Sequence, residues 1–182
     1  MYTAAIYGHS QVRGLEFQHI PGLNIEKIFR PGATLRSLRG GDCFSQLAAA
    51  SPNIVVLFLG GNDITGDVEV VDLYQLLLEM VQAITLTINP AFGVYVIEPE
   101  WRTKPRGISA SSYNKVKNSL ARMIKRRKEM HILSLHYLGI NTPDCLASDG
   151  VHINSQYCQR VSSMLERFLR GRLFGAKPGG GL

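Results

Sequence analysis

Short apolar runs alternate with longer helical patterns along the chain, and this alternation restricts the fold more than any other feature of the sequence. Five runs are predicted to be strands: Thr3–Tyr7, Ile25–Phe29, Ile54–Leu59, Val94–Ile97 and Ile132–Leu135. Strands that alternate with helices are typical of βαβ units, in which parallel strands share one sheet and helices cover its faces. We therefore expect an α/β protein with a five-stranded parallel sheet in a three-layer α/β/α sandwich.

Three helices are predicted from apolar residues that recur at three- and four-residue steps. The first follows the third strand and has the apolar positions Leu73, Leu76, Leu77, Met80, Val81, Ile84 and Ile88. The second has Tyr113, Val116, Leu120, Met123 and Ile124, and the last has Tyr157, Val161, Met164, Leu165, Phe168 and Leu169. Gly171 is expected to end the last helix, because glycine readily adopts the left-handed backbone found just past a helix end.

The length of 182 residues suits one compact domain with a hydrophobic core and is short for two. We expect that domain to span residues 1–174. The remaining residues, 175–182, read GAKPGGGL, have nothing to bury and are predicted to be disordered.

Composition indicates a soluble globular protein, since 45% of the residues are hydrophobic and 19% are charged. No window has the roughly 18 uninterrupted apolar residues of a membrane span, and the first residues lack the basic start of a signal peptide. The three cysteines are odd in number and have no CxxC spacing, which argues against a disulfide framework and a structural zinc site. We expect an intracellular protein in a reducing compartment.

Four polar and glycine-rich blocks stand where a parallel sheet would place its ligand site. In an open α/β sheet that site lies beyond the carboxyl ends of the strands. Three blocks directly follow predicted strands and the fourth precedes the last helix: Gly8-His9-Ser10, Pro31-Gly32-Ala33-Thr34, Gly60-Gly61-Asn62-Asp63 and Ser148-Asp149-Gly150-Val151-His152. All four blocks are expected at one edge of the sheet.

These blocks contain the groups that acyl transfer requires. A serine hydroxyl is a poor nucleophile until an imidazole removes its proton, and a carboxylate must orient that imidazole. Ser10, His152 and Asp149 can take these three roles. The tetrahedral intermediate also needs donors aimed at its oxyanion. The candidates for this oxyanion hole are the backbone N–H groups of Ser10 and Gly32 and the side-chain amide of Asn62.

The ordered set GxS, a later glycine, GxND and DxxH resembles the SGNH/GDSL hydrolases, from Gly8 to His152. The resemblance implies a flavodoxin-like three-layer fold and a serine esterase that hydrolyses small acyl esters, of the acetyl or lipid type, without a cofactor or metal. It implies Ser10 as nucleophile, Asp149 and His152 as the acid–base pair, and Gly32 and Asn62 as oxyanion residues. The chain departs from the family at His9, where an aspartate is usual. Short Gly-His-Ser versions are also similar to SGNH-like domains of retrotransposon proteins.

The second helix carries many basic residues, which opens an alternative function. Its run Lys125-Arg126-Arg127-Lys128 and the net charge of +6 suit contact with nucleic acid or an anionic membrane. Other basic residues of this helix, Lys115, Lys117 and Arg122, are expected to face water with them. The alternative is a catalytically inactive SGNH-like binding or assembly module within a larger protein. A plain solvated face is the structural explanation of the same charges.

Each block also has a purely structural interpretation. Ser10 could cap a helix, and Asn62-Asp63 and Asp149 could form turns. Glu98 and Glu100 follow the fourth strand, but a glycosidase with paired carboxylates would leave the serine and histidine blocks unexplained. Trp101 and Arg102 follow the same strand, where they would line an acyl pocket or a partner surface. A metal site made of His131, His136 and Cys145 lacks convincing ligand spacing.

Overall fold

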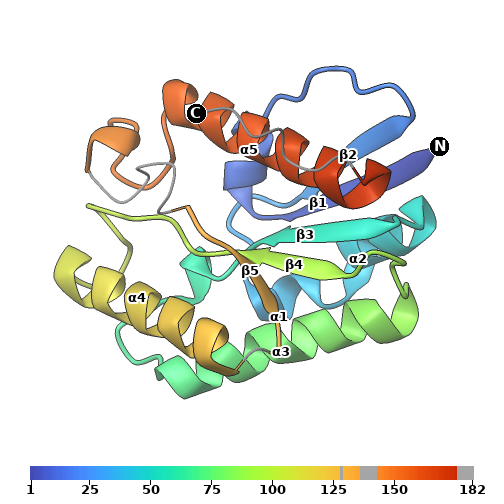
Figure 1. The fold of residues 1–182 in the computed structure, drawn as a ribbon. Coiled ribbons are helices and arrows are strands. Elements are labelled where there is room, and N and C mark those ends of the chain that lie inside the picture. Colours follow the sequence, from blue (N-terminus) through green and yellow to red (C-terminus); the bar gives the residue numbers. More distant parts are fainter. Residues whose placement is uncertain (128, 136–142, 176–182) are drawn as a thin grey trace.

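A computed structural model describes residues 1–127, 129–135 and 143–175 of the chain. Its centre is one five-stranded parallel sheet, with the strands in the order β2-β1-β3-β4-β5 (Figure 1). The strands are β1 (Tyr2–Gly8), β2 (Leu23–Phe29), β3 (Ile54–Phe58), β4 (Val94–Ile97) and β5 (His131–Leu133). The predicted α/β architecture and its five strands are confirmed, with end points within two residues.

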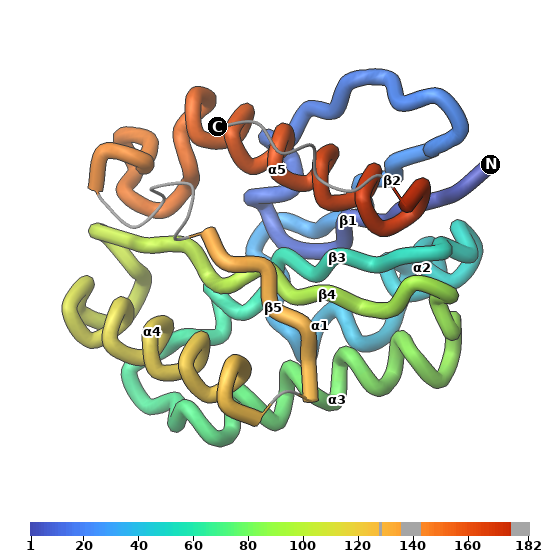
Figure 2. Tube along the Cα trace, viewed as in Figure 1, coloured from blue at the N-terminus to red at the C-terminus, as the bar shows by residue number. Residues whose placement is uncertain are grey.

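Helices cover both faces of the sheet, so that the molecule has three layers (Figures 1 and 2). One face packs against α1 (Leu35–Leu38), α2 (Gly41–Ala50), α3 (Val70–Thr87) and α4 (Ala110–Arg127). The other face packs against the 3-10 turn η1 (Ser10–Gly14) and α5 (Ser155–Phe174). Two further 3-10 turns, η2 (Gly61–Asp63) and η4 (Pro143–Cys145), lie in loops.

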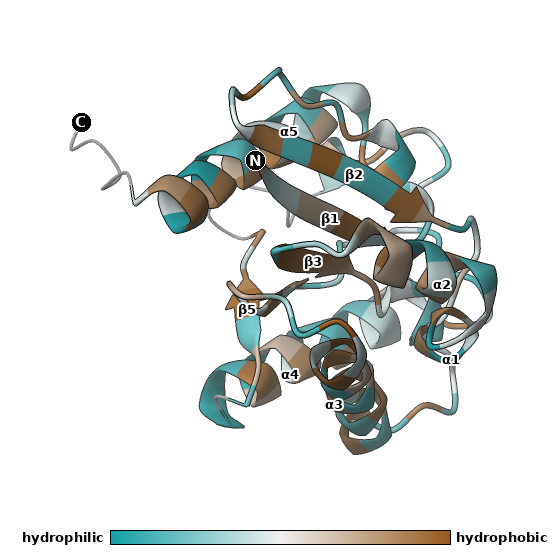
Figure 3. Ribbon diagram, turned by 90° about the vertical axis from the view of Figure 1, so that its right-hand side faces the viewer, coloured by the Kyte–Doolittle hydropathy of each residue, from teal (hydrophilic) through white to brown (hydrophobic). Residues whose placement is uncertain are grey.

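Burial on both faces explains why the inner strands read as continuous apolar runs. All five residues of β3 are buried, and so are the last five of β1. A strand that is covered on both sides needs apolar side chains at every position, whereas an edge strand with one wet side alternates. The edge strand β2 mixes polar and apolar residues, and Figure 3 shows its bands of both kinds in contrast to the uniformly apolar β3, on the other side of β1.

The strand order creates a switch point between β1 and β3. From β1 the chain crosses to β2 on one side, and after β3 it continues to β4 and β5 on the other side. The two crossovers leave in opposite directions, which opens a crevice at the carboxyl ends of β1 and β3. Ser10 begins η1 directly after β1, and η2 with Asn62 follows β3. The fold therefore places two of the sequence blocks at this crevice.

The last helix runs further than the sequence predicts. Gly171 does not end α5, which continues to Phe174 and is capped by Gly175 with a φ of 66°. Leu173 is buried beyond Gly171. Burying a leucine stabilises the helix by about 2 kcal/mol, which offsets the roughly 1 kcal/mol that an internal glycine costs. Gly175 thus belongs to the helix end rather than to the predicted tail, and residues 176–182 lie outside the described part of the chain.

The helix α3 has the length and hydropathy of a membrane span, with 18 residues and a mean hydropathy of 1.3. Its inner face nevertheless packs in the core through Leu73, Leu77, Met80 and Ile84. A core helix of this composition passes the same test, so the feature is weak evidence for a membrane. An intracellular location stays a prediction.

Candidate active site

Ser10, His152 and Asp149 form a continuous hydrogen-bonded chain. Ser10 Oγ lies 2.8 Å from His152 Nε2, and His152 Nδ1 lies 2.6 Å from Asp149 Oδ2. With Nδ1 donating to the carboxylate, Nε2 has a lone pair directed at the serine hydroxyl. The sheet thus brings together two sequence blocks that are 142 positions apart.

Asp149 is held as a carboxylate by three hydrogen bonds. Besides the imidazole, the backbone N–H groups of Val151 and His152 donate to its Oδ1, each at 2.9 Å. Partial burial works to raise the pKa of Asp149, but these hydrogen bonds outweigh it and bring the pKa to about 2. Asp149 therefore forms the turn that one structural interpretation expected, and it also orients the ring of His152.

Gln11 connects the serine segment to the histidine loop, and sequence reasoning missed it. Its side-chain amide donates to Val151 O at 2.9 Å, and its Oε1 accepts from Ile153 N at 3.1 Å. The side chain is buried. A glutamine next to the candidate nucleophile has no periodicity that would reveal this contact.

The loop after β4 supports the histidine loop from its other side. The backbone N–H groups of Thr103 and Lys104 donate to Gly150 O at 2.9 and 3.1 Å. Gly150 has a φ of 69°, and a Cβ there would lie 2.5 Å from Thr103 Oγ1. Both the backbone conformation and the close approach therefore require glycine.

The candidate oxyanion residues Gly32 and Asn62 line one pocket of about 680 Å³. The other lining residues are Thr34, Gly61, Ile64, Thr65, Gly66, Asp67, Arg102, Arg106 and Gly107. Gly32 has a φ of 71° and open space where a Cβ would be. Asn62 Nδ2 donates to Ala33 O at 3.0 Å, which leaves its second N–H available.

A buried polar cluster lies behind these residues. The sequence placed Arg102 at this edge as a pocket-lining residue, and it does line the pocket, but its contacts were not predicted. Arg102 Nε donates to Glu100 Oε1 at 2.7 Å, and Arg102 Nη2 bonds to the same oxygen. Arg102 Nη2 also donates to Asn62 Oδ1 at 3.1 Å. His9 completes the cluster, with Nε2 3.9 Å from Glu100 Oε2. Because Glu100 is committed to Arg102, it is not half of a paired-carboxylate site.

Burial sets the protonation of this cluster. Desolvation lowers the pKa of His9 to about 4, and the opposing field of Glu100 is weaker than that effect. His9 Nδ1 accepts from Gln11 N at 3.4 Å, so the neutral ring carries its proton on Nε2, facing Glu100. Desolvation would raise the pKa of Glu100, but the neighbouring charges, Arg102 above all, and the hydrogen bonds to the carboxylate together outweigh it and lower the pKa. At neutral pH the cluster therefore holds one carboxylate, one guanidinium and a neutral imidazole.

Asp63 lies beside Asn62 and anchors α1. Both carboxylate oxygens accept from Leu35 N, at 3.0 and 3.2 Å. Burial raises the pKa of Asp63 to about 6, although this hydrogen bond and Arg36 act to lower it. The GxND block thus combines a pocket-lining amide with a carboxyl that fixes the adjacent helix.

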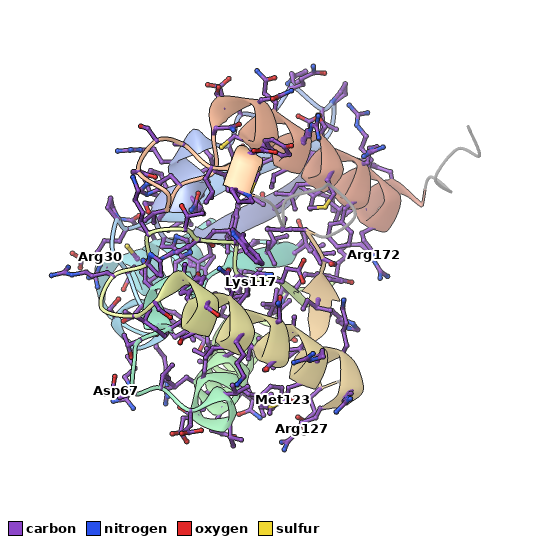
Figure 4. All side chains as sticks on the ribbon, turned by 90° about the vertical axis from the view of Figure 1, so that its left-hand side faces the viewer. Arg30, Asp67, Lys117, Met123, Arg127 and Arg172 are labelled. Carbon is purple, nitrogen blue, oxygen red and sulfur yellow. The ribbon has the colours of Figure 1, made fainter. Side chains whose placement is uncertain are left out.

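The basic run at the end of α4 is exposed in its described part. Lys125, Arg126 and Arg127 are exposed, and Lys128 lies outside the described residues. Figure 4 shows Arg127 at the end of this helix, where its guanidinium lies 5.0 Å from the Tyr74 ring centre. The expectation for Lys117 was wrong, because it is 3% exposed and burial lowers its pKa.

The structure also bears on the metal site that was considered and set aside in the sequence analysis. His131 lies in β5 and Cys145 in η4, while His136 lies outside the described part of the chain. No group of three potential metal ligands occurs among the residues that the structure describes.

No family model and no curated protein matches the sequence. Solved structures do match the fold. An acetyl xylan esterase has a TM-score of 0.65 at 15% identity, over 92% of this chain and 99% of that one. A member of the lipolytic protein G-D-S-L family from Veillonella parvula DSM 2008 has a TM-score of 0.64 at 15% identity, over 92% and 98%.

A peptidoglycan O-acetylesterase has a TM-score of 0.65 at 21% identity, over 85% of this chain but only 48% of the other. All these identities are too low to carry substrate or activity across. What the similarities establish is architecture, over nearly the whole chain. The protein has the α/β/α fold of the SGNH/GDSL esterases.

Proposed function

We propose that the protein is a serine esterase that works through an acyl-enzyme on Ser10. The observation that carries the proposal is the hydrogen-bonded chain from Ser10 Oγ through His152 to Asp149. A serine, a histidine and a carboxylate in this order are the groups that acyl transfer uses on several unrelated folds. The esterase folds of the similar structures support the same reaction class.

In the first half-reaction His152 Nε2 removes the proton of Ser10 Oγ as the oxygen attacks the ester carbonyl. Asp149 stabilises the imidazolium that forms, because its low pKa keeps it a carboxylate. The imidazolium then protonates the leaving alcohol. In the second half-reaction His152 takes a proton from water and the resulting hydroxide attacks the acyl group. The bond between the acyl carbon and Ser10 Oγ then breaks, the imidazolium returns its proton to Ser10 Oγ, and the carboxylic acid leaves.

The oxyanion of each tetrahedral intermediate is assigned to three donors: the N–H groups of Ser10 and Gly32 and the free N–H of Asn62. Gly32 suits this role because no Cβ stands beside its amide. Removing one such donor typically lowers kcat by about 100- to 1000-fold.

The pocket that Gly32 and Asn62 line is built largely from small residues, which suits a small acyl group. Four glycines and two threonines leave space, and Ile64 is the one large apolar side chain among the lining residues. Acetyl esters are therefore the first substrates to test, followed by longer acyl chains. A role within a mobile-element protein would be a separate property and is carried by the sequence resemblance alone.

The test compares wild type with Ser10→Ala on a series of acyl esters from acetyl upward. We expect Ser10→Ala to lose at least about 1000-fold in kcat while circular dichroism stays unchanged. The control is Ser111→Ala, an exposed serine on α4, which should retain full activity.

A folded wild type without turnover would contradict the proposal, as would full activity in Ser10→Ala. Of these two outcomes, the absence of turnover in wild type would favour the binding-module alternative. Its first test would be salt-dependent binding of polyanions by a variant with Lys125, Arg126 and Arg127 changed to Gln.

A further inference from the structure

We infer that Arg102 is a positioning residue that fixes the orientation of the Asn62 amide, and that Glu100 holds Arg102 in place for this purpose. The inference rests on the proposed esterase function, in which Asn62 stabilises the oxyanion. Arg102 also lines the pocket, but the role inferred here acts through Asn62.

An asparagine side chain can rotate by half a turn and exchange its oxygen for its nitrogen. Only one of these orientations offers an N–H to an oxyanion. Arg102 Nη2 donates to Asn62 Oδ1 at 3.1 Å, and Asn62 Nδ2 donates to Ala33 O at 3.0 Å. A guanidinium has no acceptor and a carbonyl has no donor, so the flipped amide would lose both contacts. The two neighbours therefore select the orientation that leaves one N–H free.

The guanidinium is itself locked from several sides. Its Nε and Nη2 both bond to Glu100 Oε1, and its plane lies over the Tyr113 ring, 5.2 Å from the centre. Asn114 binds the backbone of Arg102, accepting from its N at 3.3 Å and donating to its O at 2.8 Å. The Arg102 side chain is only 6% exposed and that of Glu100 is fully buried. Arg102 and Glu100 are therefore held to each other, because separating them would leave two unpaired charges in the interior, at a high cost in free energy.

The pair also packs tightly against the segment that carries Asn62. A Cβ on Gly61 would lie 2.7 Å from Arg102 Nη2 and 2.9 Å from Glu100 Oε1. The glycine before the asparagine therefore allows the ion pair to reach the amide.

His9 leaves this arrangement undisturbed because it stays neutral. A protonated His9 would compete with Arg102 for Glu100, across the 3.9 Å that separates Nε2 from Oε2. Its low pKa prevents this competition at neutral pH. The residue directly before Ser10 is thus compatible with the ion pair behind Asn62.

The test is a double-mutant cycle between Arg102→Lys and Asn62→Ala. Lysine keeps a positive charge for Glu100, and so protects folding, but it lacks the fork that reaches two acceptors. We expect Arg102→Lys to lower kcat by about 10- to 100-fold with KM within about twofold, which is less than removal of a whole oxyanion donor. In the Asn62→Ala background the same change should have no further effect on kcat. Arg122→Lys, an exposed arginine on α4, is the control.

A second readout does not need turnover. In a ¹⁵N-labelled protein the side-chain NH₂ signals of Asn62 should shift and exchange faster with water in Arg102→Lys. Those of Asn24, which lies in β2 and donates to Glu26 Oε1 at 3.0 Å, should stay unchanged. An equal loss of kcat in both backgrounds, or unchanged Asn62 signals, would overturn the inference. Absence of activity in wild type would instead count against the esterase proposal, and the NMR comparison would still decide the orientation of Asn62.

Discussion

The side chain of Gln11 holds the backbone on both sides of His152. Its two hydrogen bonds, to Val151 O and from Ile153 N, tie η1 to the loop that presents the imidazole. Ser10 and His152 come from opposite ends of the chain, so their 2.8 Å contact depends on how these two segments are joined. Gln11 is the most direct side-chain link between them.

Replacing Gln11 by alanine should weaken both the site and the fold. Two buried backbone groups would lose their partners, which should lower the free energy of unfolding by about 2 kcal/mol. The looser Ser10–His152 contact should reduce kcat more than it raises KM. Urea unfolding and steady-state kinetics measure the two effects. Gln156→Ala, an exposed glutamine on α5, should change neither, and an unaltered kcat in Gln11→Ala would contradict the prediction.

Gly150→Ala should be much more harmful than a glycine-to-alanine change at another left-handed position. Gly41 has a φ of 74° with nothing within 4 Å of an added Cβ, whereas the Cβ at Gly150 would collide with Thr103 and Lys104. Gly41→Ala therefore shows the effect of backbone strain alone, about 1 kcal/mol. Thermal unfolding of both variants should show a clearly larger drop in Tm for Gly150→Ala. Equal decreases in Tm for the two variants would mean that Thr103 and Lys104 move aside at no cost in stability.

Restoring the aspartate that is usual before the nucleophile should destabilise this protein. His9→Asp would place a second carboxylate beside the fully buried Glu100, and an uncompensated buried charge typically costs about 3 kcal/mol or more. His9→Asn has the same shape without the charge and is the matched control. The difference in unfolding free energy between the two variants should be large at pH 7.5 and shrink as the pH falls. Equal unfolding free energies for His9→Asp and His9→Asn at pH 7.5 would contradict the prediction, because the second carboxylate would then have no cost in this cluster.

His9 and Asp63 should give opposite slopes to stability between pH 4 and 6.5. The pKa of His9 is lower in the folded protein, so its contribution is complete above about pH 6.5 and is lost as the pH falls towards 4. The pKa of Asp63 is higher in the folded protein, so its contribution is complete below about pH 4 and is lost as the pH rises through 6. Each is worth about 3 kcal/mol by linkage, and the two nearly cancel.

Single variants should separate these slopes. Asp63→Asn should lose stability steeply from pH 7 to 4, and His9→Gln should gain stability over part of the same range. Unfolding in urea at several pH values gives the comparison. A profile of Asp63→Asn that parallels the wild type would show that Asp63 does not titrate in this range.

The sheet was predictable because each inner strand is buried on both faces and so leaves an uninterrupted apolar run. Val94–Ile97 was predicted with its observed bounds. The end of α5 was not predicted correctly. Gly171 has the local pattern of a helix end, whereas the burial of Leu173 depends on packing against residues that are distant in the sequence. The prediction for Lys117 was wrong for a similar reason: α4 carries many exposed basic residues, but Lys117 is one of its buried positions.

Within the candidate site, the sequence indicated residues that follow strands but not the contacts that support them. Ser10, Asn62 and His152 stand in recognisable blocks, each tied to a strand end or a helix start. Gln11 and Arg102 act through partners 140 and 40 positions away. No local pattern encodes such contacts, because they depend on how the loops meet above the sheet.

The separation of Ser10 from His152 has a consequence for the order of events during synthesis. The proposed nucleophile Ser10 leaves the ribosome before its base His152, which lies 142 positions later in the loop before α5. A nascent chain that stops short of Asp149 contains the serine but nothing to activate it. Onset of esterase turnover in a refolding experiment would therefore report the arrival of the C-terminal segment, and it should lag behind the appearance of helical signal.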